Sequence, residues 1–358
     1  MRKSCCSRQV KTELVHFSGC YTASVTPMTK LRDVDYEGLL NLVEFQVREG
    51  VQGILSVGTT GESPTLDWNE HNKVIERTKE YAGEKCEAIA GTGSNSTQET
   101  IEATAHALHI GIKNILIVDP YYNGPSSIEI RKEYVEPIAR QFPQMQIIPY
   151  VIPGRTGTQL LPQDLAVLHQ QYPNVRTVKE ATGDIENMKL TRKLCGPDYD
   201  ILSGDDDKTF AMMTIPEISA SGVISVVSNI APRAVAGMAH FIHDGKLNEA
   251  RELAEALKPL FSIVTVKTQE QTSFGPATCK ARNPLPYKTL MNILGMPSGP
   301  CRQPLGKMTS AGLEVVLAAA REVYEKNPQI LLPIADYFDV NIHDRLYNER
   351  FWQGLTYA

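Results

Sequence analysis

The feature that most restricts the fold of this chain is a regular alternation of short apolar segments with longer segments of helical periodicity. The short segments are rich in β-branched residues and predict buried strands, whereas the longer ones space their apolar residues as amphipathic helices do. We expect eight strands, at residues 19–25, 53–57, 87–91, 114–118, 146–151, 175–179, 200–203 and 222–226. Successive strands start roughly 20 to 35 residues apart, which is the length that a strand, a crossover helix and two connections need.

Eight strand–helix units predict an α/β fold of the (β/α)8 TIM barrel type, spanning residues 19–245. A doubly wound open sheet has the same alternation and is the alternative. No G-x-G-x-x-G motif follows the first predicted strand, so the dinucleotide-binding form of that sheet has no support.

Outside residues 19–245 the pattern differs. Residues 1–18 are expected to form a flexible N-terminal segment. Residues 246–326 predict a C-terminal helical appendage, with helices at 247–266, 287–294 and 311–325. The polar stretch 268–283 between the first two helices is expected to be an irregular loop. Residues 327–358 form an extension with two prolines and several aromatic residues, and it predicts either a contact with another subunit or a strap packed on its own domain.

Composition points to small-molecule chemistry. The chain of 358 residues has a net charge of -5 and no long basic run, so nucleic acid is not an expected partner. No apolar stretch of about 18 residues occurs, and neither membrane insertion nor secretion is expected. The seven cysteines have neither a disulfide framework nor metal-binding spacing, which fits the reducing cytoplasm. The acidic run 205–207 is expected to cap the following helix rather than to bind a cation.

Lys179 is the candidate nucleophile, because it stands where the sixth predicted strand ends. An ordinary lysine amine is almost fully protonated at pH 7, but burial among apolar neighbours lowers its pKa. A neutral amine can condense with a ketone or an aldehyde to form a Schiff base. The alternative is a lysine whose ammonium group is solvated or paired with the adjacent Glu180.

Other polar residues follow neighbouring strands and are expected at the same face of the barrel as the lysine. The second strand ends in the turn 58–63, whose free N–H groups and hydroxyls suit a small carboxylate. The fourth strand is followed by Tyr121 and Tyr122. The fifth ends at Tyr150, whose phenol can transfer protons, and Arg155 follows with a guanidinium suited to a carboxylate. An amine, a phenol and carboxylate-binding groups predict ketone activation through an enamine, without a metal or a cofactor.

Six ordered motifs in this chain resemble those of the dihydrodipicolinate synthase family. They are Gly58-Thr59-Thr60-Gly61-Glu62-Ser63, Tyr121-Tyr122-Asn123, Tyr150 with Pro153-Gly154-Arg155-Thr156-Gly157, Lys179-Glu180-Ala181-Thr182-Gly183, Ser203-Gly204-Asp205-Asp206 and Gly222-Val223-Ile224-Ser225-Val226. A seventh similarity, Asn283-Pro284-Leu285-Pro286-Tyr287-Lys288, lies in the appendage. The resemblance extends from about residue 19 to about residue 325. It implies a class I aldolase-type lyase that condenses pyruvate with aspartate semialdehyde to give 4-hydroxy-tetrahydrodipicolinate in the diaminopimelate route to lysine.

The resemblance also implies four catalytic roles. Lys179 would form the Schiff base with pyruvate, and Tyr150 would shuttle protons. Thr59 would link Tyr150 to Tyr122, which in this family reaches across a dimer interface into the neighbouring site. The implied assembly is therefore a homodimer or a homotetramer.

Four further residues are implied to bind substrates. Thr60 and Gly58 would hold the pyruvate carboxylate, Arg155 would hold the carboxylate of the semialdehyde, and Ile224 would line the pyruvate pocket. The family also includes members that lysine inhibits, and the positions implied for that inhibitor are Ser63, Trp68, His71, Asn95, Glu99 and Tyr121. The alternative for this last group is that His71 and Glu99 are ordinary surface residues of helices.

Two other functions stay open at this point. Relatives that act on sugar acids, such as N-acetylneuraminate lyase and keto-deoxy sugar acid aldolases, share the lysine and the tyrosine, although Arg155 favours the synthase. A barrel that only binds a small molecule, or serves as a scaffold, is the alternative from another class. Pro149 and Val151 depart from the family pattern beside the tyrosine, where Val151 replaces a usual asparagine, so their effect on the site is open.

Overall fold

The computed structural model describes residues 15–357 and contains a closed barrel of eight parallel strands. The strands are β1 (Gly19–Ala23), β2 (Gly53–Ser56), β3 (Glu87–Gly91), β4 (Asn114–Val118), β5 (Gln146–Val151), β6 (Thr177–Glu180), β7 (Asp200–Ser203) and β8 (Gly222–Ser225). Each strand pairs with the next one in the sequence, and β8 pairs with β1, which closes the ring. The predicted (β/α)8 TIM barrel is therefore confirmed.

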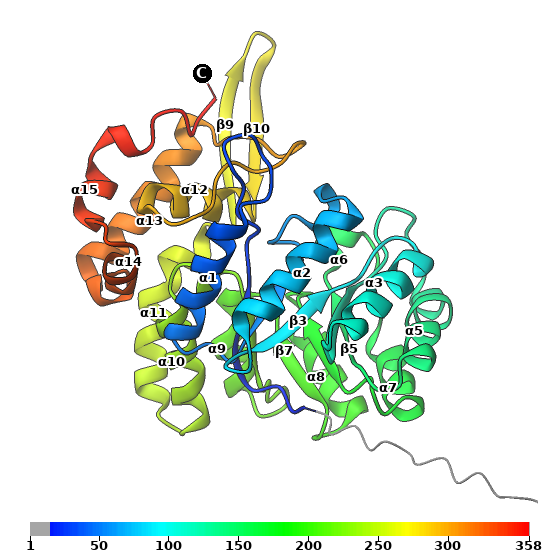
Figure 1. Ribbon diagram of the computed structural model, residues 1–358. Coiled ribbons are helices and arrows are strands. Elements are labelled where there is room, and N and C mark those ends of the chain that lie inside the picture. The colour runs from blue at the N-terminus through cyan, green and yellow to red at the C-terminus, as the bar shows by residue number, and fades with distance from the viewer. Residues whose placement is uncertain (1–14, 358) are drawn as a thin grey trace, which may run out of the picture.

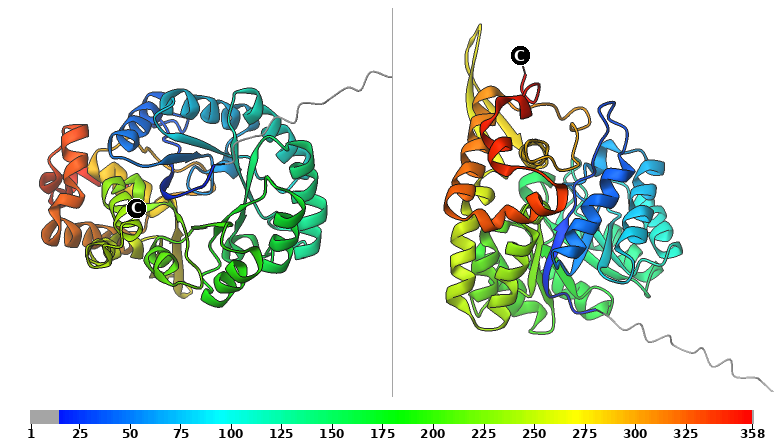
Figure 2. Two further views of the ribbon diagram at one scale, coloured as in Figure 1. Left: turned by 90° about the horizontal axis from the view of Figure 1, so that it is seen from below. Right: turned by 60° about the vertical axis from the view of Figure 1, so that its left-hand side comes forward.

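The barrel strands are buried on both faces, as parallel strands covered by helices are. The covering helices are α1 (Tyr36–Arg48), α2 (Trp68–Ala82), α3 (Thr97–His109), α4 (Ser127–Glu129), α5 (Glu136–Gln141), α7 (Pro162–Gln171), α8 (Ile185–Cys195), α9 (Thr209–Thr214) and α10 (Pro232–His243), while the one-turn helix α6 (Pro153–Thr156) follows β5. A view along the barrel shows these helices as a ring around the strands, with the C-terminal helices to one side (Figure 2).

Short polar residues set where several of these helices begin. The Asp67 side chain accepts hydrogen bonds from the backbone N–H groups at the start of α2. The Glu70 carboxylate in turn accepts from the Asp67 backbone N–H, which completes a capping box. Ser96 caps α3, and Asp184 caps α8 through the N–H groups of Glu186 and Asn187. The loop after β6 therefore ends at a capped helix.

The region after the barrel contains a β-hairpin that the sequence pattern does not predict. Helix α11 (Leu247–Ser262) ends four residues earlier than predicted. The strands β9 (Thr265–Thr272) and β10 (Gly275–Arg282) replace the last two residues of that predicted helix and nearly all of the predicted loop. The two strands pair antiparallel from Thr265–Arg282 to Thr272–Gly275 and project from the molecule as an arm (Figure 1). Half of their residues are exposed and all but one of the others are only partly buried, so no alternation of apolar and polar residues marked them as strands.

The rest of the chain is helical and packs on its own domain. It consists of α12 (Leu285–Leu294), α13 (Ser310–Lys326), α14 (Leu332–Phe338) and α15 (Ile342–Tyr347), with 3-10 turns at Pro328–Ile330 and Glu349–Phe351. The ring of Phe45 in α1 lies 5.4 Å from that of Tyr337 and 5.3 Å from that of Phe338. The described part of the extension therefore forms a strap on the barrel. The segment predicted to be flexible lies largely outside the described residues, and no helix within them is long and apolar enough to span a membrane.

A buried ion pair joins the appendage to the turn after β2. The ammonium nitrogen of Lys288 in α12 lies 2.6 Å from a carboxylate oxygen of Glu62, and both side chains are almost completely buried. Lys288 also donates to the carbonyl oxygens of Thr26 and Pro300, at 3.0 Å each. The second oxygen of Glu62 accepts from the Arg302 backbone N–H at 2.7 Å. Since a buried charge is tolerated only when it is paired, this cluster fixes the turn 58–63.

Candidate active site

A cavity of about 220 Å³ lies where the barrel strands end at their carboxyl side. Its walls come from the segments that follow five strands and from the foot of the β9–β10 hairpin, where Thr265 pairs with Arg282. The lining side chains that bear on chemistry are Thr59, Thr60, Tyr150, Arg155, Lys179, Asp205, Arg282 and Asn283. The face predicted from the strand ends is therefore a real cavity, and residues more than 200 positions apart meet in it.

Lys179 and Tyr150 are neighbours in this cavity. They are paired in register on adjacent strands β6 and β5, and the lysine nitrogen lies 4.1 Å from the centre of the tyrosine ring. Only 4% of Lys179 is exposed to solvent. Burial lowers its pKa to about 8, although the nearby carboxylates of Asp206 and Asp205 act in the opposite direction. The amine is thus far more often neutral than an exposed lysine would be.

Glu180 does not pair with Lys179, so the alternative considered for this lysine is wrong. β6 continues through Glu180, and successive residues of a strand point to opposite sides. The Glu180 carboxylate accepts hydrogen bonds from the Thr182 backbone at 2.7 Å and from the Asn187 amide at 2.9 Å. It therefore fixes the loop after β6 and leaves Lys179 without a partner on its own strand.

The acidic run 205–207 does not act as predicted. Asp205 stands at the start of the 3-10 turn Asp206–Lys208 but makes no capping bond with its side chain. The Asp206 carboxylate instead accepts from the backbone N–H groups of Val226 and Val227, at 2.9 and 3.1 Å, and from the Ser225 hydroxyl. The closed barrel places β8 beside β7, so the nearest unsatisfied N–H groups belong to the turn after β8. Burial raises the pKa of Asp205 to about 6.

Tyr150 is buried beside the lysine, and burial raises the pKa of its phenol well above the ordinary value. Arg155 and the Thr59 hydroxyl, which is within hydrogen-bonding reach, act in the opposite direction. The phenol therefore keeps its proton at neutral pH and can donate it to a neighbouring atom.

Asn283 connects two predicted substrate-binding residues. Its side-chain amide donates to the Thr60 hydroxyl at 3.0 Å, and its backbone carbonyl accepts from the Arg155 guanidinium at 2.9 Å. Asn283 begins one of the motifs seen in the sequence, but the motif alone gives this residue no role. Burial lowers the pKa of Arg155, whose guanidinium has lost much of its hydration.

Three of the predicted catalytic and substrate-binding residues, Tyr122, Ile224 and Gly58, lie outside this cavity in the single chain. Tyr122 is 93% exposed and has a positive φ of 78°, a conformation that side chains rarely adopt. Ile224 is fully buried within β8 and is not in the cavity wall, which instead contains Val226, two residues further on. Gly58 lines a neighbouring cavity of about 210 Å³, together with Thr59.

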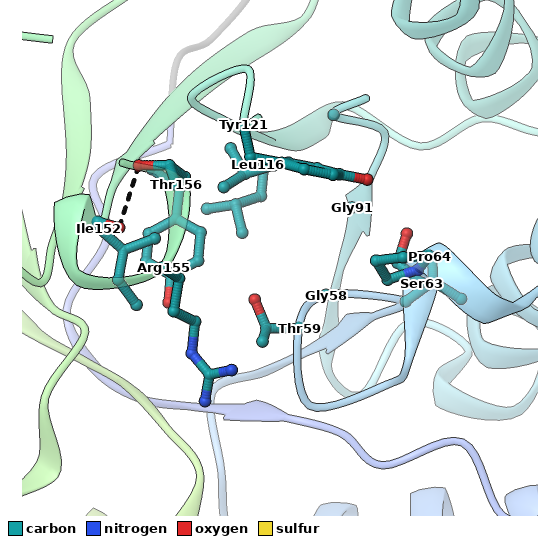
Figure 3. A pocket seen from close by; sticks show the side chains of 14 residues that line it. Gly58, Thr59, Ser63, Pro64, Gly91, Leu116, Tyr121, Ile152, Arg155 and Thr156 are labelled. Atoms are coloured by element: carbon teal, nitrogen blue, oxygen red, sulfur yellow. Dashed lines mark hydrogen bonds between the residues drawn. The ribbon is translucent and has the colours of Figure 1, made fainter. Parts of the chain in front are cut away.

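The neighbouring cavity shares Thr59, Tyr150 and Arg155 with the first one. Figure 3 shows Arg155, Thr59 and Tyr121 around one open space, with Ser63 on the side away from Arg155. Both cavities therefore have walls in common.

The six residues implied for inhibitor binding gather in and behind the wall of this second cavity. Ser63 and Tyr121 line it. His71 lies behind Ser63, with its Nε2 3.1 Å from the serine hydroxyl and its ring centre 4.9 Å from that of Trp68. His71 is buried and burial lowers its pKa to about 4, so it is not a surface residue.

The other members of the group adjoin Tyr121. Asn95 accepts a hydrogen bond from the Tyr121 backbone at 3.0 Å. Glu99 accepts from the Ser94 hydroxyl. Burial raises the pKa of the Tyr121 phenol, and the nearby Glu99 carboxylate raises it further. The six residues thus form two clusters, one around Ser63 and one around Tyr121, and both of these residues line the second cavity. Within residues 15–357, no group of three or more His, Cys, Asp or Glu side chains is arranged to hold a metal ion.

Comparison with known proteins gives a consistent result. The model of the dihydrodipicolinate synthetase family matches residues 16–322. A 4-hydroxy-tetrahydrodipicolinate synthase of Methanococcus maripaludis is 39% identical over 293 residues, which cover 82% of this chain and 94% of that protein. The crystal structure of a dihydrodipicolinate synthase from Aquifex aeolicus is 36% identical, with a TM-score of 0.78 over 88% of this chain and 99% of that one. A crystal structure of the enzyme from Cyanidioschyzon merolae with lysine bound is 32% identical, with a TM-score of 0.77 over 86% and 98% of the two chains.

Proposed function

Because the chain belongs to the dihydrodipicolinate synthetase family, we propose that it condenses pyruvate with aspartate semialdehyde through a Schiff base on Lys179. It is a lyase of lysine biosynthesis, and its product is 4-hydroxy-tetrahydrodipicolinate. The observation that carries the assignment of the residues is the buried amine of Lys179, 4.1 Å from the ring of Tyr150. A neutral amine beside a protonated phenol is the pair that imine formation requires.

The chemistry follows from this pair. The neutral amine adds to the keto carbon of pyruvate, and the resulting hydroxyl leaves as water after Tyr150 donates a proton. Tyr150, now a phenolate, takes a proton from the methyl group and so gives an enamine, whose terminal carbon attacks the aldehyde carbon of the second substrate. Tyr150 donates this proton to the aldehyde oxygen as the new carbon–carbon bond forms. The amino group that came with the semialdehyde then attacks the imine carbon, gives a proton to the Tyr150 phenolate and displaces the Lys179 amine, which closes the ring and frees the enzyme. The Thr59 hydroxyl, beside the phenol, is the first group of the path by which these protons reach solvent.

The substrate carboxylates have separate sites in this proposal. The turn 58–63 holds the carboxylate of pyruvate through Thr60 and the backbone beside Gly58, and Ile224 supports the wall beneath it. Arg155 holds the carboxylate of the semialdehyde. Asn283 keeps both sites at a fixed separation, because it bonds to Thr60 and to Arg155 at once.

Tyr122 acts in a neighbouring subunit's site, and the protein is at least a homodimer. The support is its exposure together with its strained backbone, since such strain persists where the surroundings stabilise it. Sedimentation of the intact chain tests the assembly. A monomer with full activity, or a Tyr122→Phe variant with unchanged kcat, would contradict this role.

Lysine is proposed to bind at the clusters around Ser63 and Tyr121. The relative from Cyanidioschyzon merolae has lysine bound, and here Glu99 offers a carboxylate for an ammonium group. Initial rates measured with millimolar lysine test the proposal, and an unchanged rate would refute it.

A reducing compartment such as the cytoplasm is supported by the described cysteines, all five of which are unpaired.

The decisive experiment is reduction with borohydride in the presence of pyruvate, followed by intact-mass measurement and peptide mapping. We expect one reduced pyruvyl adduct per chain, located at Lys179 and absent from a Lys179→Met variant. A pyruvate-binding scaffold would give no adduct. Turnover with aspartate semialdehyde, compared with turnover of sugar aldehydes, then separates the synthase from an aldolase that acts on sugar acids.

A further inference from the structure

The foot of the β9–β10 hairpin brings a second guanidinium group to the cavity. Arg282 is the last residue of β10 and pairs with Thr265, the first residue of β9. Both residues line the cavity that contains Lys179 and Arg155. The hairpin therefore does more than extend from the surface, because its base forms part of the wall of the site.

Arg282 and Arg155 are held by a reciprocal pair of hydrogen bonds. The Arg282 guanidinium donates to the carbonyl oxygen of Gly154, the residue before Arg155, at 3.3 Å. The Arg155 guanidinium donates to the carbonyl oxygen of Asn283, the residue after Arg282, at 2.9 Å. Each arginine is thus anchored to the backbone beside the other one, and the two groups face one cavity from the segment after β5 and from the hairpin.

The Asp205 carboxylate lines the same cavity and partly opposes the effect of burial on the pKa of Arg155, but it forms no ion pair with either arginine. In the part of the chain that the structure describes, neither guanidinium forms a salt bridge with a carboxylate, and their hydrogen bonds go to backbone carbonyls. Arg282 is among the groups that lower the pKa of Arg155, after burial, as a like charge nearby does. Two guanidinium groups that remain together at a cavity favour an anionic ligand, and a carboxylate suits their planar donors.

We propose that Arg282 is a specificity-determining residue that binds, together with Arg155, the carboxylate of the second substrate. The inference rests on the proposed function and deepens it: the enzyme selects aldehydes that carry a carboxylate over neutral ones. The carboxylate of pyruvate is not the ligand of Arg282, because it is assigned to the buried turn at Thr60. Arg282 is only partly buried, whereas Thr60 and Lys179 are buried, so it stands on the solvent side of the imine.

Lys280 provides a matched control. It lies two residues before Arg282, on the same face of β10, and carries the same charge. It is exposed and does not line the cavity. Replacing Lys280 therefore removes one positive charge from the hairpin without removing a group from the site.

The experiment compares Arg282→Gln, Arg282→Lys and Lys280→Gln in the full-length enzyme. Glutamine can still donate a hydrogen bond to the Gly154 carbonyl but lacks the charge. We expect Arg282→Gln to raise the KM for aspartate semialdehyde about tenfold, the usual effect of losing a charged partner in a binding site. The KM for pyruvate and the yield of the borohydride-reduced adduct should stay within about twofold. Arg282→Lys should recover most of the loss, and Lys280→Gln should behave as the unmodified enzyme.

Two results would overturn the inference. One is an unchanged KM for aspartate semialdehyde in Arg282→Gln. The other is an equal rise of both KM values, which would indicate that Arg282 only shapes the cavity. Failure of the proposed function has a separate signature, since the unmodified enzyme would then give no adduct with pyruvate. The preference for aspartate semialdehyde over a neutral aldehyde such as propionaldehyde, measured as a ratio of kcat/KM values, should fall in Arg282→Gln and remain in Lys280→Gln.

Discussion

The rate at which Lys179 captures pyruvate should depend on pH with a midpoint near 8. Burial lowers the pKa of this amine to about 8, from 10.5 for an ordinary lysine. At pH 7 roughly one amine in ten is then neutral, compared with about one in three thousand for the unshifted group. The folded barrel thus makes the reactive form on the order of 300 times more abundant.

The direction of the pH dependence follows from the form that reacts. Only the neutral amine adds to the keto carbon, so the rate increases as pH rises towards the pKa and then levels off. Between pH 6 and pH 8 the neutral fraction increases from about 1% to about 50%. The phenol of Tyr150 does not reverse this increase, because its pKa is raised above the ordinary value and it stays protonated across the range.

The assay is the initial rate of adduct formation at limiting pyruvate, trapped with cyanoborohydride and measured by intact mass. The rate should rise about 50-fold from pH 6 to pH 8 and change little above pH 9. Lys179→Met is the control for reaction at other lysines. A rate that continues to rise tenfold per pH unit up to pH 10 would show that the amine has an ordinary pKa, and the argument from burial would be wrong.

Three further predictions concern the groups around this amine. Asp206→Asn removes the largest influence that raises the pKa of Lys179, so the midpoint of the same profile should move below 8; a shift to higher pH would refute this. Tyr150→Phe should lower kcat by about 10² to 10⁴ and should also slow formation of the adduct with pyruvate, as burst and steady-state rates can show; unchanged kcat would exclude the phenol as the proton donor. Lys288→Met leaves the Glu62 carboxylate buried and unpaired, so the free energy of unfolding in urea should fall by about 3–5 kcal/mol. Adding Glu62→Gln should recover part of that loss, and no recovery would mean that the charge is not its cause.

The sequence predicted the barrel well because each strand and helix of the barrel has its own local signal. Strand ends in a parallel barrel share one face, so Lys179, Tyr150 and Arg155 could be brought together from their positions alone. Their neighbours could not be assigned in the same way. Asp206 was expected to cap its own helix, whereas it binds N–H groups after β8, because the pairing of strands places those groups closer. Likewise, exposed Tyr122 has a role only if a second subunit covers it.

The hairpin shows why some functional residues escape sequence patterns. A buried strand needs apolar residues on at least one face, whereas β9 and β10 are mostly solvated and their order comes from backbone pairing and from anchoring at the foot. That foot is fixed at Val266, which is buried beneath the appendage, and at Arg282, which bonds across to Gly154. An arginine in a polar stretch has no local signal that separates it from a solvated one. The role proposed for Arg282 can be inferred only from the folded chain, which places it beside Arg155. Lys179, in contrast, could be identified from its position at the end of a predicted strand.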